Sequence, residues 1–465
     1  MTPSLNQKLQ ENSALILMVA YLTLVMLTGG SGRDDTQALL VLRPLTIVFL
    51  GFAIWPWLNG MGNRGRYFLI SSVSLLVVTA LYLIPLPGGV WVDLPMRDIL
   101  ADIDRSVFGE VSARPLALNP LSAWENLNAL LVPITAVLLM LRLNERQRRQ
   151  ILPIVICFGL FSGLLGMMQS ISSGQSSLYF YRITNNGSAV GLFANRNHQA
   201  LLLCMLYPML AGYVAIRQRS KSLNNRVLWF ALLAGAPLIP LILVTGSRSG
   251  LVLAVVGLLL AFCIYWQSQK AARQAEGKKI PKWPVAAAAI MIAGLFAATL
   301  HMSRAEAFQR FFGSDGSENR LAFWKPIYEM ANALFPVGSG PGGFPNAYSV
   351  FEPNGLLDPS YLNHAHNDWL EIFVTHGALA ISLIIATIGF LSYVAYCNFY
   401  RVQSSSRLLS FVGIATVVIA ILGSIGDYPM RTPIISTIIA ISVVWSMYSS
   451  ESSGNFRQQD PKFVD

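Results

Sequence analysis

Long apolar runs separated by short polar segments make up most of the chain. Each run is close to the roughly 20 residues that a helix needs to cross the hydrocarbon core of a membrane. We predict about twelve such spans, at 13–29, 38–58, 67–85, 122–141, 150–171, 198–216, 227–245, 250–267, 284–300, 368–397, 408–426 and 433–449. The pattern therefore predicts an all-α, polytopic integral membrane protein.

One long polar stretch, residues 301–376, interrupts this pattern. It contains a glycine-rich turn at 338–343, and three of the five histidines lie in its last thirteen positions. Polar groups beside a membrane are costly unless they are paired or used. We therefore expect chemistry in this part of the chain.

Lysines and arginines are concentrated in every second loop. Such loops usually face the cytoplasm, so we predict that both termini are cytoplasmic. Three longer segments then lie outside, at 86–121, 172–197 and 301–367, and the last of these is a large periplasmic loop. Within the first, residues 96–108 are amphipathic and are expected to lie at the membrane surface.

The whole chain up to residue 449 is predicted to form a single polytopic membrane domain. Its N-terminal spans cover 13–171, and the spans that carry the motifs cover 193–449. The remaining residues, 450–465, are polar and are predicted to be a disordered cytoplasmic tail.

The composition supports a membrane protein. Only 12% of the residues are charged and 54% are hydrophobic, whereas soluble proteins carry about 25% charged residues. The net charge of +10 could suggest nucleic acid, but the basic residues are divided among short loops. No nucleic-acid partner is expected.

The turn Thr245-Gly-Ser-Arg248-Ser-Gly250 joins two spans on the predicted outer side. An arginine on a tight glycine turn can bind phosphate through its planar fork, with help from backbone N–H groups. Alternatively, Arg248 extends to the lipid headgroups. The spacing alone favours the two interpretations equally.

A second outer cluster, Asn195-Arg196-Asn197-His198, stands at the entry of a span. It groups several hydrogen-bond donors at the N-terminus of a helix, and a helix N-terminus already favours anions. The structural alternative is a helix cap followed by an interfacial arginine.

The third cluster is His364-Ala-His366-Asn367-Asp368. A histidine near a carboxylate can act as a general base; the structural alternative is a satisfied interfacial histidine. The two histidines, His364 and His366, also resemble a pair of metal ligands, but no further cysteine or histidine follows at the usual zinc spacing. His376 would lie about 15 Å further along a helix, so no metal ion and no cofactor are expected.

Two other motifs resemble functional sites only superficially. The glycines at 338–343 resemble a nucleotide-binding loop, but no alternating strand and helix pattern surrounds them. We interpret them as a tight turn where backbone approaches backbone. Asp102-Ile-Asp104 resembles a metal-binding pair but lies on the amphipathic segment, where a solvated face is the expected explanation.

The order of these motifs resembles that of the O-antigen ligase and O-antigen polymerase superfamily of bacterial envelope proteins. The resemblance covers roughly residues 185 to 400. It rests on the motifs at 193–198, 245–250, 320–325, 338–344 and 364–372.

The resemblance implies a GT-C-like glycosyltransferase in the inner membrane, with its active site facing the periplasm. Such enzymes move a glycan from an undecaprenyl-diphosphate carrier to an acceptor hydroxyl, without a metal ion. The acceptor is another glycan in polymerases and lipid A-core in ligases, and the sequence does not decide between them.

The resemblance also implies roles for particular residues. Arg248 would hold the carrier diphosphate, with Arg196 as a second clamp, and His366 would be the catalytic base. His364 stays an alternative base. Supporting positions would be Arg320, Trp324, Asn367 and Asp368.

A transporter or flippase of polysaccharide is the alternative function, because it too needs many spans. Transporters usually place charged groups near the middle of the membrane. Here Arg43 is the clearest charge inside a predicted span, and this scarcity disfavours transport.

Overall fold

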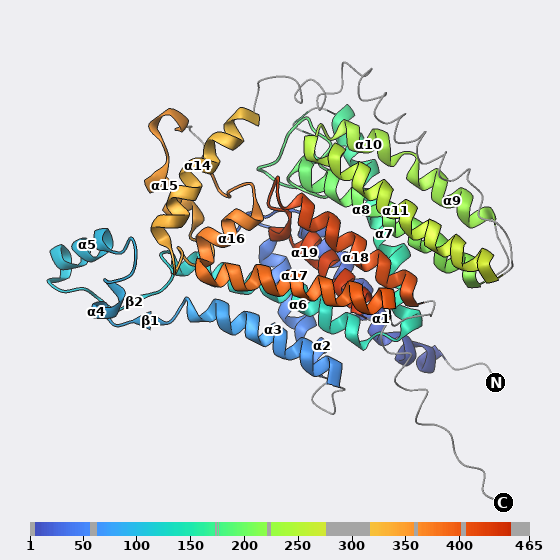
Figure 1. Ribbon diagram of the computed structural model, residues 1–465, viewed down its shortest axis with the longest axis horizontal. Coiled ribbons are helices and arrows are strands. Elements are labelled where there is room, and N and C mark those ends of the chain that lie inside the picture. The colour runs from blue at the N-terminus through green and yellow to red at the C-terminus, as the bar shows by residue number, and fades with distance from the viewer. Residues whose placement is uncertain are drawn as a thin grey trace, which may run out of the picture.

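The computed structural model describes residues 5–55, 63–172, 174, 176–220, 225–275, 317–357, 361–400 and 406–447. In the described residues, the regular elements are helices except for one pair of two-residue strands (Figure 1). The helices are α1 Leu5–Thr28, α2 Leu39–Ile54, α3 Asn63–Leu81, α4 Gly88–Trp91, α5 Asp98–Phe108, α6 Pro120–Arg142, α7 Glu145–Ile171, α8 Arg196–Ser220, α9 Asn225–Gly235, α10 Leu238–Val244, α11 Arg248–Ala275, α14 Ser317–Leu334, α15 Phe344–Phe351, α16 Asp368–His376, α17 Ala378–Tyr400, α18 Ser406–Gly423 and α19 Pro433–Met447. The structure also contains two short 3-10 helices, η2 Asn354–Leu356 and η3 Pro429–Arg431. Its two strands, β1 Pro85–Leu86 and β2 Arg114–Pro115, pair antiparallel.

The all-α, multi-pass prediction agrees with the helices that the structure describes. Five of these helices are long and apolar enough to cross a membrane, namely those at 120–142, 145–171, 196–218, 248–270 and 378–398. Several shorter apolar helices accompany them. The predicted span 284–300 lies outside the described residues, and the total of twelve spans stays a prediction.

Two predicted spans are not continuous helices. The run 227–245 is divided into α9 and α10, because Pro237 lacks an N–H and disfavours helix in the residue before it. The run 368–397 is divided into α16 and α17 at Gly377, which has a φ of +53°. Hydropathy is high on both sides of each break, so it does not reveal the break.

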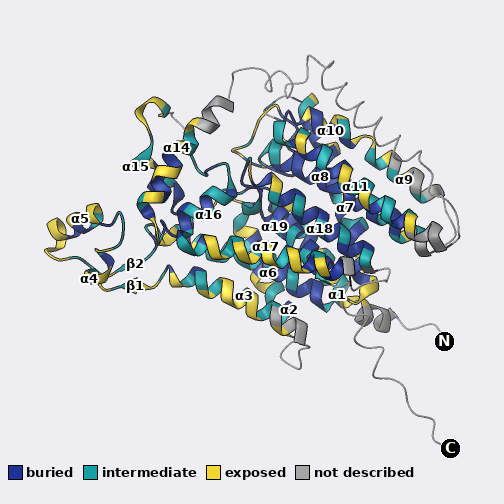
Figure 2. Ribbon diagram, viewed as in Figure 1, coloured by how far each residue is buried: buried dark blue, intermediate teal, exposed yellow. Residues whose placement is uncertain are grey.

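The main core is formed around α8. This helix packs against α7, α11 and α18, while α19 packs against α18 and α6. Figure 2 shows α8, α18 and α19 as mostly buried. Among the side chains excluded from solvent are Leu203 and Met205 of α8, Val412 of α18 and Ile438 of α19.

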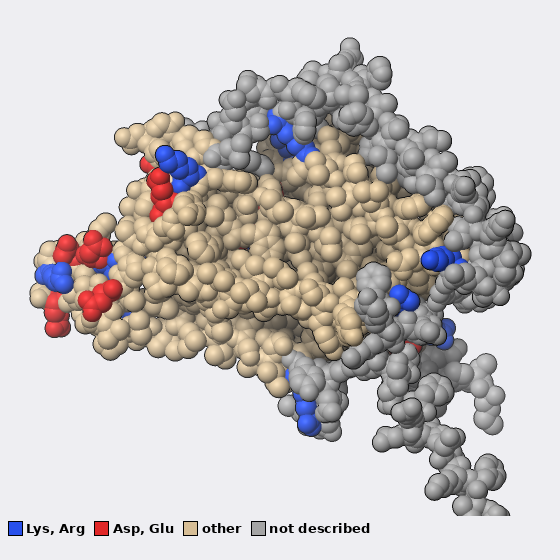
Figure 3. Space-filling model, viewed as in Figure 1, with Lys and Arg blue, Asp and Glu red and all other residues tan. Residues whose placement is uncertain are grey.

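The outer helices carry apolar side chains whose exposure to water would be unfavourable. Ile385 and Ile388, one helical turn apart on α17, are 63% and 59% exposed. Figure 3 shows a broad face without charge on the described residues, with charged groups gathered toward its margins. Exposed apolar faces of this kind are expected where lipid covers the protein.

A second, smaller core is formed by α14, α15 and α16. It includes Ile327, Leu334, Phe344, Tyr348 and Val374. Residues 317–357 of the predicted outer loop therefore form a helical subdomain packed onto α16. In Figure 1, α14 and α15 lie to one side of the main bundle.

The glycine-rich turn at 338–343 allows backbone segments to approach closely, as the sequence predicted. Gly338, Gly340 and Gly342 have φ values between +70° and +84°. An added Cβ would lie 2.5 Å from the Thr375 carbonyl at Gly338 and 2.6 Å from Ala117 Cα at Gly340. The turn thus holds the subdomain against α16 and the segment that precedes α6.

The amphipathic segment 96–108 contains α5, and its position at the membrane surface stays a prediction. Asp104 on this helix is buried and accepts a hydrogen bond from Arg114 Nε at 2.9 Å. This hydrogen bond, with a smaller contribution from the Ser112 amide, lowers the pKa of Asp104. Asp104 therefore holds the strand β2 rather than facing solvent, and only Asp102 of the pair is exposed.

Candidate functional site

Three segments that are distant in the chain meet at one end of the bundle. They are the start of α8 at 195–198, the entry of α16 at 364–371, and the connection 424–431 between α18 and α19. All are polar and lie beside long apolar helices. The last segment contributes the residues that join the other two.

Asp427 is the centre of this arrangement. Its Oδ1 lies 3.0 Å from His366 Nδ1 and accepts a hydrogen bond from the Tyr428 amide. Its Oδ2 accepts from Asn195 Nδ2 at 3.0 Å and from Asn197 Nδ2 at 2.6 Å. The carboxylate is 2% exposed, so its burial is compensated by four hydrogen bonds.

His366 is held in an unusual backbone conformation. Its φ is +49°, in the left-handed region that few residues other than glycine adopt. The following residue, Asn367, caps α16 by accepting hydrogen bonds from the amides of Trp369 and Leu370. Asn367 therefore has a structural role: it begins the helix directly after the histidine.

The two histidines differ in how their ring nitrogens are engaged. His364 Nδ1 lies 2.9 Å from Glu371 Oε1, and its Nε2 lies 3.3 Å from the Gly32 carbonyl. Its side chain is 13% exposed, against 25% for His366. His366 uses Nδ1 for Asp427, and no hydrogen bond to its Nε2 is found among the described residues.

Tyr428 packs against both of these histidines. Its ring centroid lies 4.2 Å from that of His364 and 5.1 Å from that of His366. A third histidine, the buried His198, meets the same ring at 5.2 Å. The tyrosine thus links the start of α8 with the entry of α16.

Arg431 connects two buried carboxylates on α16. Its Nη2 lies 3.1 Å from Glu371 Oε1, and its Nε lies 3.6 Å from Asp368 Oδ1. Burial raises the pKa of Asp368 to about 7, against the opposing charge of Arg431. Burial also acts on Glu371, but Arg431 and His364 outweigh it and lower the pKa of Glu371 to about 2.

The two predicted phosphate-binding arginines begin neighbouring helices. Arg196 is the first residue of α8 and Arg248 is the first residue of α11. These helices pack closely at this end, since a Cβ on Gly250 would lie 2.6 Å from Ala200 Cβ. Two helix N-termini with their partial positive charges therefore lie side by side.

The start of α11 also approaches the Asp427 segment. A Cβ built on Gly426 would lie 3.7 Å from Ser249 Cβ. The side chain of Ser247 caps α11 by accepting from the Gly250 amide at 3.0 Å. Nη2 of Arg248 is buried and has no hydrogen-bond partner among the described residues.

A cavity of about 670 Å³ opens beside His364. Glu371 and Arg431 line it, together with Asp34 and Asn126 from the N-terminal half. His366 is not among the lining residues. The cavity is therefore lined by His364 and not by the His366–Asp427 pair.

The remaining predicted residues, Arg320 and Trp324, lie on α14. Trp324 is half-buried on α14, and Arg320 is on the same helix with its side chain outside the described residues. Arg43, considered as a possible transport residue, pairs with Glu125 on α6 and lies 3.6 Å from Asp34. This pairing explains how its charge is tolerated.

Sequence reasoning missed Asp427, Tyr428 and Arg431. The signal was present, because the turn Gly426-Asp427-Tyr428-Pro429-Met430-Arg431 places two charges between entirely apolar runs. Charges kept at a membrane boundary are expected to be paired or functional.

The fold and the buried polar cluster define a multi-pass, all-helical membrane protein with a site at one end of its spans. Residues 233–385 match the family model described as O-antigen ligase. This match confirms the predicted resemblance to the O-antigen ligase and polymerase superfamily. The matched stretch includes Arg248 and both histidines, whereas Asp427 and Arg196 lie outside it. No curated protein has a matching sequence.

Proposed function

We propose that this protein is a periplasmic-face glycosyltransferase of the O-antigen ligase or polymerase type. It transfers a glycan from an undecaprenyl-diphosphate carrier to an acceptor hydroxyl, without a metal ion. The observation that carries the proposal is the His366–Asp427 pair, which lies where α8 and α11 begin with Arg196 and Arg248.

His366 is the proposed base. The carboxylate of Asp427 favours the tautomer in which Nδ1 carries the proton, which leaves the lone pair of Nε2 available. Nε2 takes the proton of the acceptor hydroxyl as its oxygen bonds to the anomeric carbon. His364 is the less suitable base, because both its ring nitrogens have partners.

The departing diphosphate is the other half of the reaction. As the acceptor oxygen attacks, the bond between the anomeric carbon and the diphosphate oxygen breaks, and its electron pair leaves with the diphosphate. Arg248 and Arg196, with two helix N-termini, would stabilise this charge. Attack opposite the leaving group predicts inversion at the anomeric carbon.

The cavity beside His364 is a suitable place for part of the glycan. It is lined by carboxylate, amide and guanidinium groups that can bond sugar hydroxyls. This arrangement does not distinguish a lipid A-core acceptor from a second glycan chain.

The test is transfer by the purified protein in nanodiscs, supplied with an undecaprenyl-diphosphate glycan and candidate acceptors. Arg248→Ala and His366→Ala should each abolish product while the protein elutes as a folded species. Arg66→Ala, an exposed residue of α3, is the matched control and should stay active. Full activity in the first two variants would refute the site assignment, and loss of activity on chelation would refute the metal-free mechanism.

A further inference from the structure

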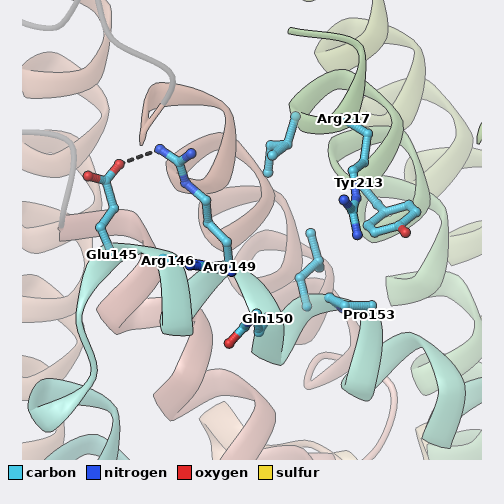
Figure 4. Close-up of a pocket in the computed structure, with 9 residues that line it drawn as sticks. Glu145, Arg146, Arg149, Gln150, Pro153, Tyr213 and Arg217 are labelled. Atoms are coloured by element: carbon cyan, nitrogen blue, oxygen red, sulfur yellow. Dashed lines mark hydrogen bonds and ion pairs between the residues drawn. The ribbon is translucent and has the colours of Figure 1, made fainter. Parts of the chain in front are cut away.

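A second polar pocket lies between α7 and α8, at the end of these helices remote from Asp427. Its volume is about 580 Å³, and its lining includes Arg146, Arg149 and Arg217 with a single carboxylate, Glu145. Figure 4 shows Arg149 paired with Glu145 on α7, and Arg217 beside the Tyr213 ring on α8 at the other side of the pocket. The catalytic proposal does not use any of these residues.

The charge of this pocket is only partly compensated. Glu145 pairs with Arg149 one helical turn away. Arg146 and Arg217 are exposed, and among the described residues no other carboxylate lines the pocket. Three guanidinium groups against one carboxylate make the pocket attractive to an anion.

The neighbouring Arg148 has a different role. It is buried, and its guanidinium donates to the carbonyls of Met140 and Leu141 at 3.1 Å. It thereby fixes the connection between α6 and α7. The arginines in the pocket are presented from this anchored helix start, and Arg217 lies over the Tyr213 ring at 5.5 Å.

The length of α8 would place the pocket at the depth of lipid headgroups. Arg196 and Arg217 are separated by 21 positions of one continuous helix, which corresponds to about 32 Å of rise. The hydrocarbon core of a membrane is about 30 Å thick. If the Arg196 end of α8 lies at one membrane surface, Arg217 lies at the other.

The pocket is also lined by apolar side chains, and these favour a phospholipid over a free phosphate as the ligand. Leu152, Pro153 and Ile216 complete the pocket below the arginines. A free phosphate would leave this surface unused, whereas a phospholipid would place its phosphate on the arginines and its acyl chains along the apolar helices. We infer that the pocket binds the phosphate headgroup of an anionic phospholipid in the membrane leaflet opposite the His366 site.

The inference can be tested by native mass spectrometry of the purified full chain in detergent. Phosphatidylglycerol is added in one series, phosphatidylcholine in a second, and inorganic phosphate in a third. Phosphatidylglycerol should bind with the highest occupancy. The double variant Arg146→Gln/Arg217→Gln should lower its affinity by about tenfold or more, since each charged hydrogen bond is removed.

The matched control is Arg66→Gln, an exposed arginine on α3 outside the pocket. It should bind phosphatidylglycerol as the parent chain does. The single variants Arg146→Gln and Arg217→Gln serve if the double variant is unstable, and each should show part of the loss. Equal binding of phosphatidylcholine, unchanged affinity in these variants, or full competition by inorganic phosphate would each overturn the lipid assignment.

Discussion

Asp427 lies among the polar side chains of three segments and bonds to the proposed base. A carboxylate placed on Nδ1 of a histidine orients the ring and selects its tautomer. Asp427 does not itself have to contact the substrate. We therefore regard it as a positioning residue, whose effect is exerted through His366.

Asp427→Asn should lower the turnover number by about 10²- to 10⁴-fold, because an amide can donate to Nδ1 and favour the wrong tautomer. The Michaelis constant for the carrier-linked donor should change little, since the arginines are untouched. Steady-state kinetics of transfer would separate the two constants. The control is Asp102→Asn, which alters an exposed carboxylate on α5. An equal loss in both variants, or a change confined to the Michaelis constant, would contradict the positioning role.

Asp368 should make stability depend on pH. Its pKa is about 7 in the folded protein and about 3.9 in an unfolded chain, so its protonation favours the fold. This contribution is complete below about pH 4 and is lost as the pH rises through about 7. At about 1.36 kcal/mol per pKa unit, it amounts to at most about 4 kcal/mol.

Asp368→Asn removes the charge while keeping an acceptor for the Met430 amide. The variant should gain stability relative to the parent chain as the pH rises from about 4 to about 8. Thermal unfolding in detergent at several pH values would measure this difference. Glu371 acts in the opposite sense, losing its contribution as the pH falls below about 4.5, but it is present in both proteins. A difference that does not vary with pH would contradict the prediction.

At the scale of elements, the break between α16 and α17 places the site. Gly377 ends α16 and allows the chain to turn into α17. The Gly377 amide bonds the Phe373 carbonyl, and the Ala378 amide bonds the Pro336 carbonyl. The break thus ties the long apolar helix to the segment just before the glycine-rich turn, and it orients the short helix that carries Asp368 and Glu371.

Gly377→Ala should destabilise the protein by at least about 2 kcal/mol. Its φ is +53°, and an added Cβ would lie 2.1 Å from the Pro336 carbonyl oxygen. Gly389→Ala on α17 is the matched control, because no atom lies within 4 Å of its added Cβ. The control should differ from the parent chain by no more than about 1 kcal/mol. Unfolding by titration with sodium dodecyl sulfate would compare them, and similar values for both would show that the break is not constrained.

At the scale of the whole molecule, the two ends of the bundle have different chemistry. One end carries Asp427, the histidines and the starts of α8 and α11. The other end carries the arginine pocket at the start of α7. With the basic loops on the cytoplasmic side, the first end would face the periplasm.

This orientation predicts opposite labelling of two exposed positions. Gly355→Cys in η2 should react with a membrane-impermeant maleimide in right-side-out membrane vesicles. Arg66→Cys on α3 should react only after the vesicles are opened. The parent chain, which contains four cysteines, supplies the background in each measurement. Labelling of Arg66→Cys in closed vesicles would reverse the proposed orientation.

The sequence by itself determined the helices and the chemical character of the site. A run of about 20 apolar residues leaves the backbone no stable choice in lipid except a helix, so the spans follow from local composition. Arg248 and His366 could also be identified from the sequence, because they are polar groups at the ends of spans. The breaks at Pro237 and Gly377 were not predicted, because hydropathy does not register a change of backbone direction.

Only the tertiary structure decided which polar groups meet. Asp427 is 61 residues from His366 and 230 from Asn197, and no local pattern relates them. Their contact depends on how α8, α16 and α18 pack, and that packing is set by side-chain shape over the whole core. The same packing gave His364 partners on both ring nitrogens and left Nε2 of His366 without one among the described residues. Distinguishing the two histidines therefore required the fold.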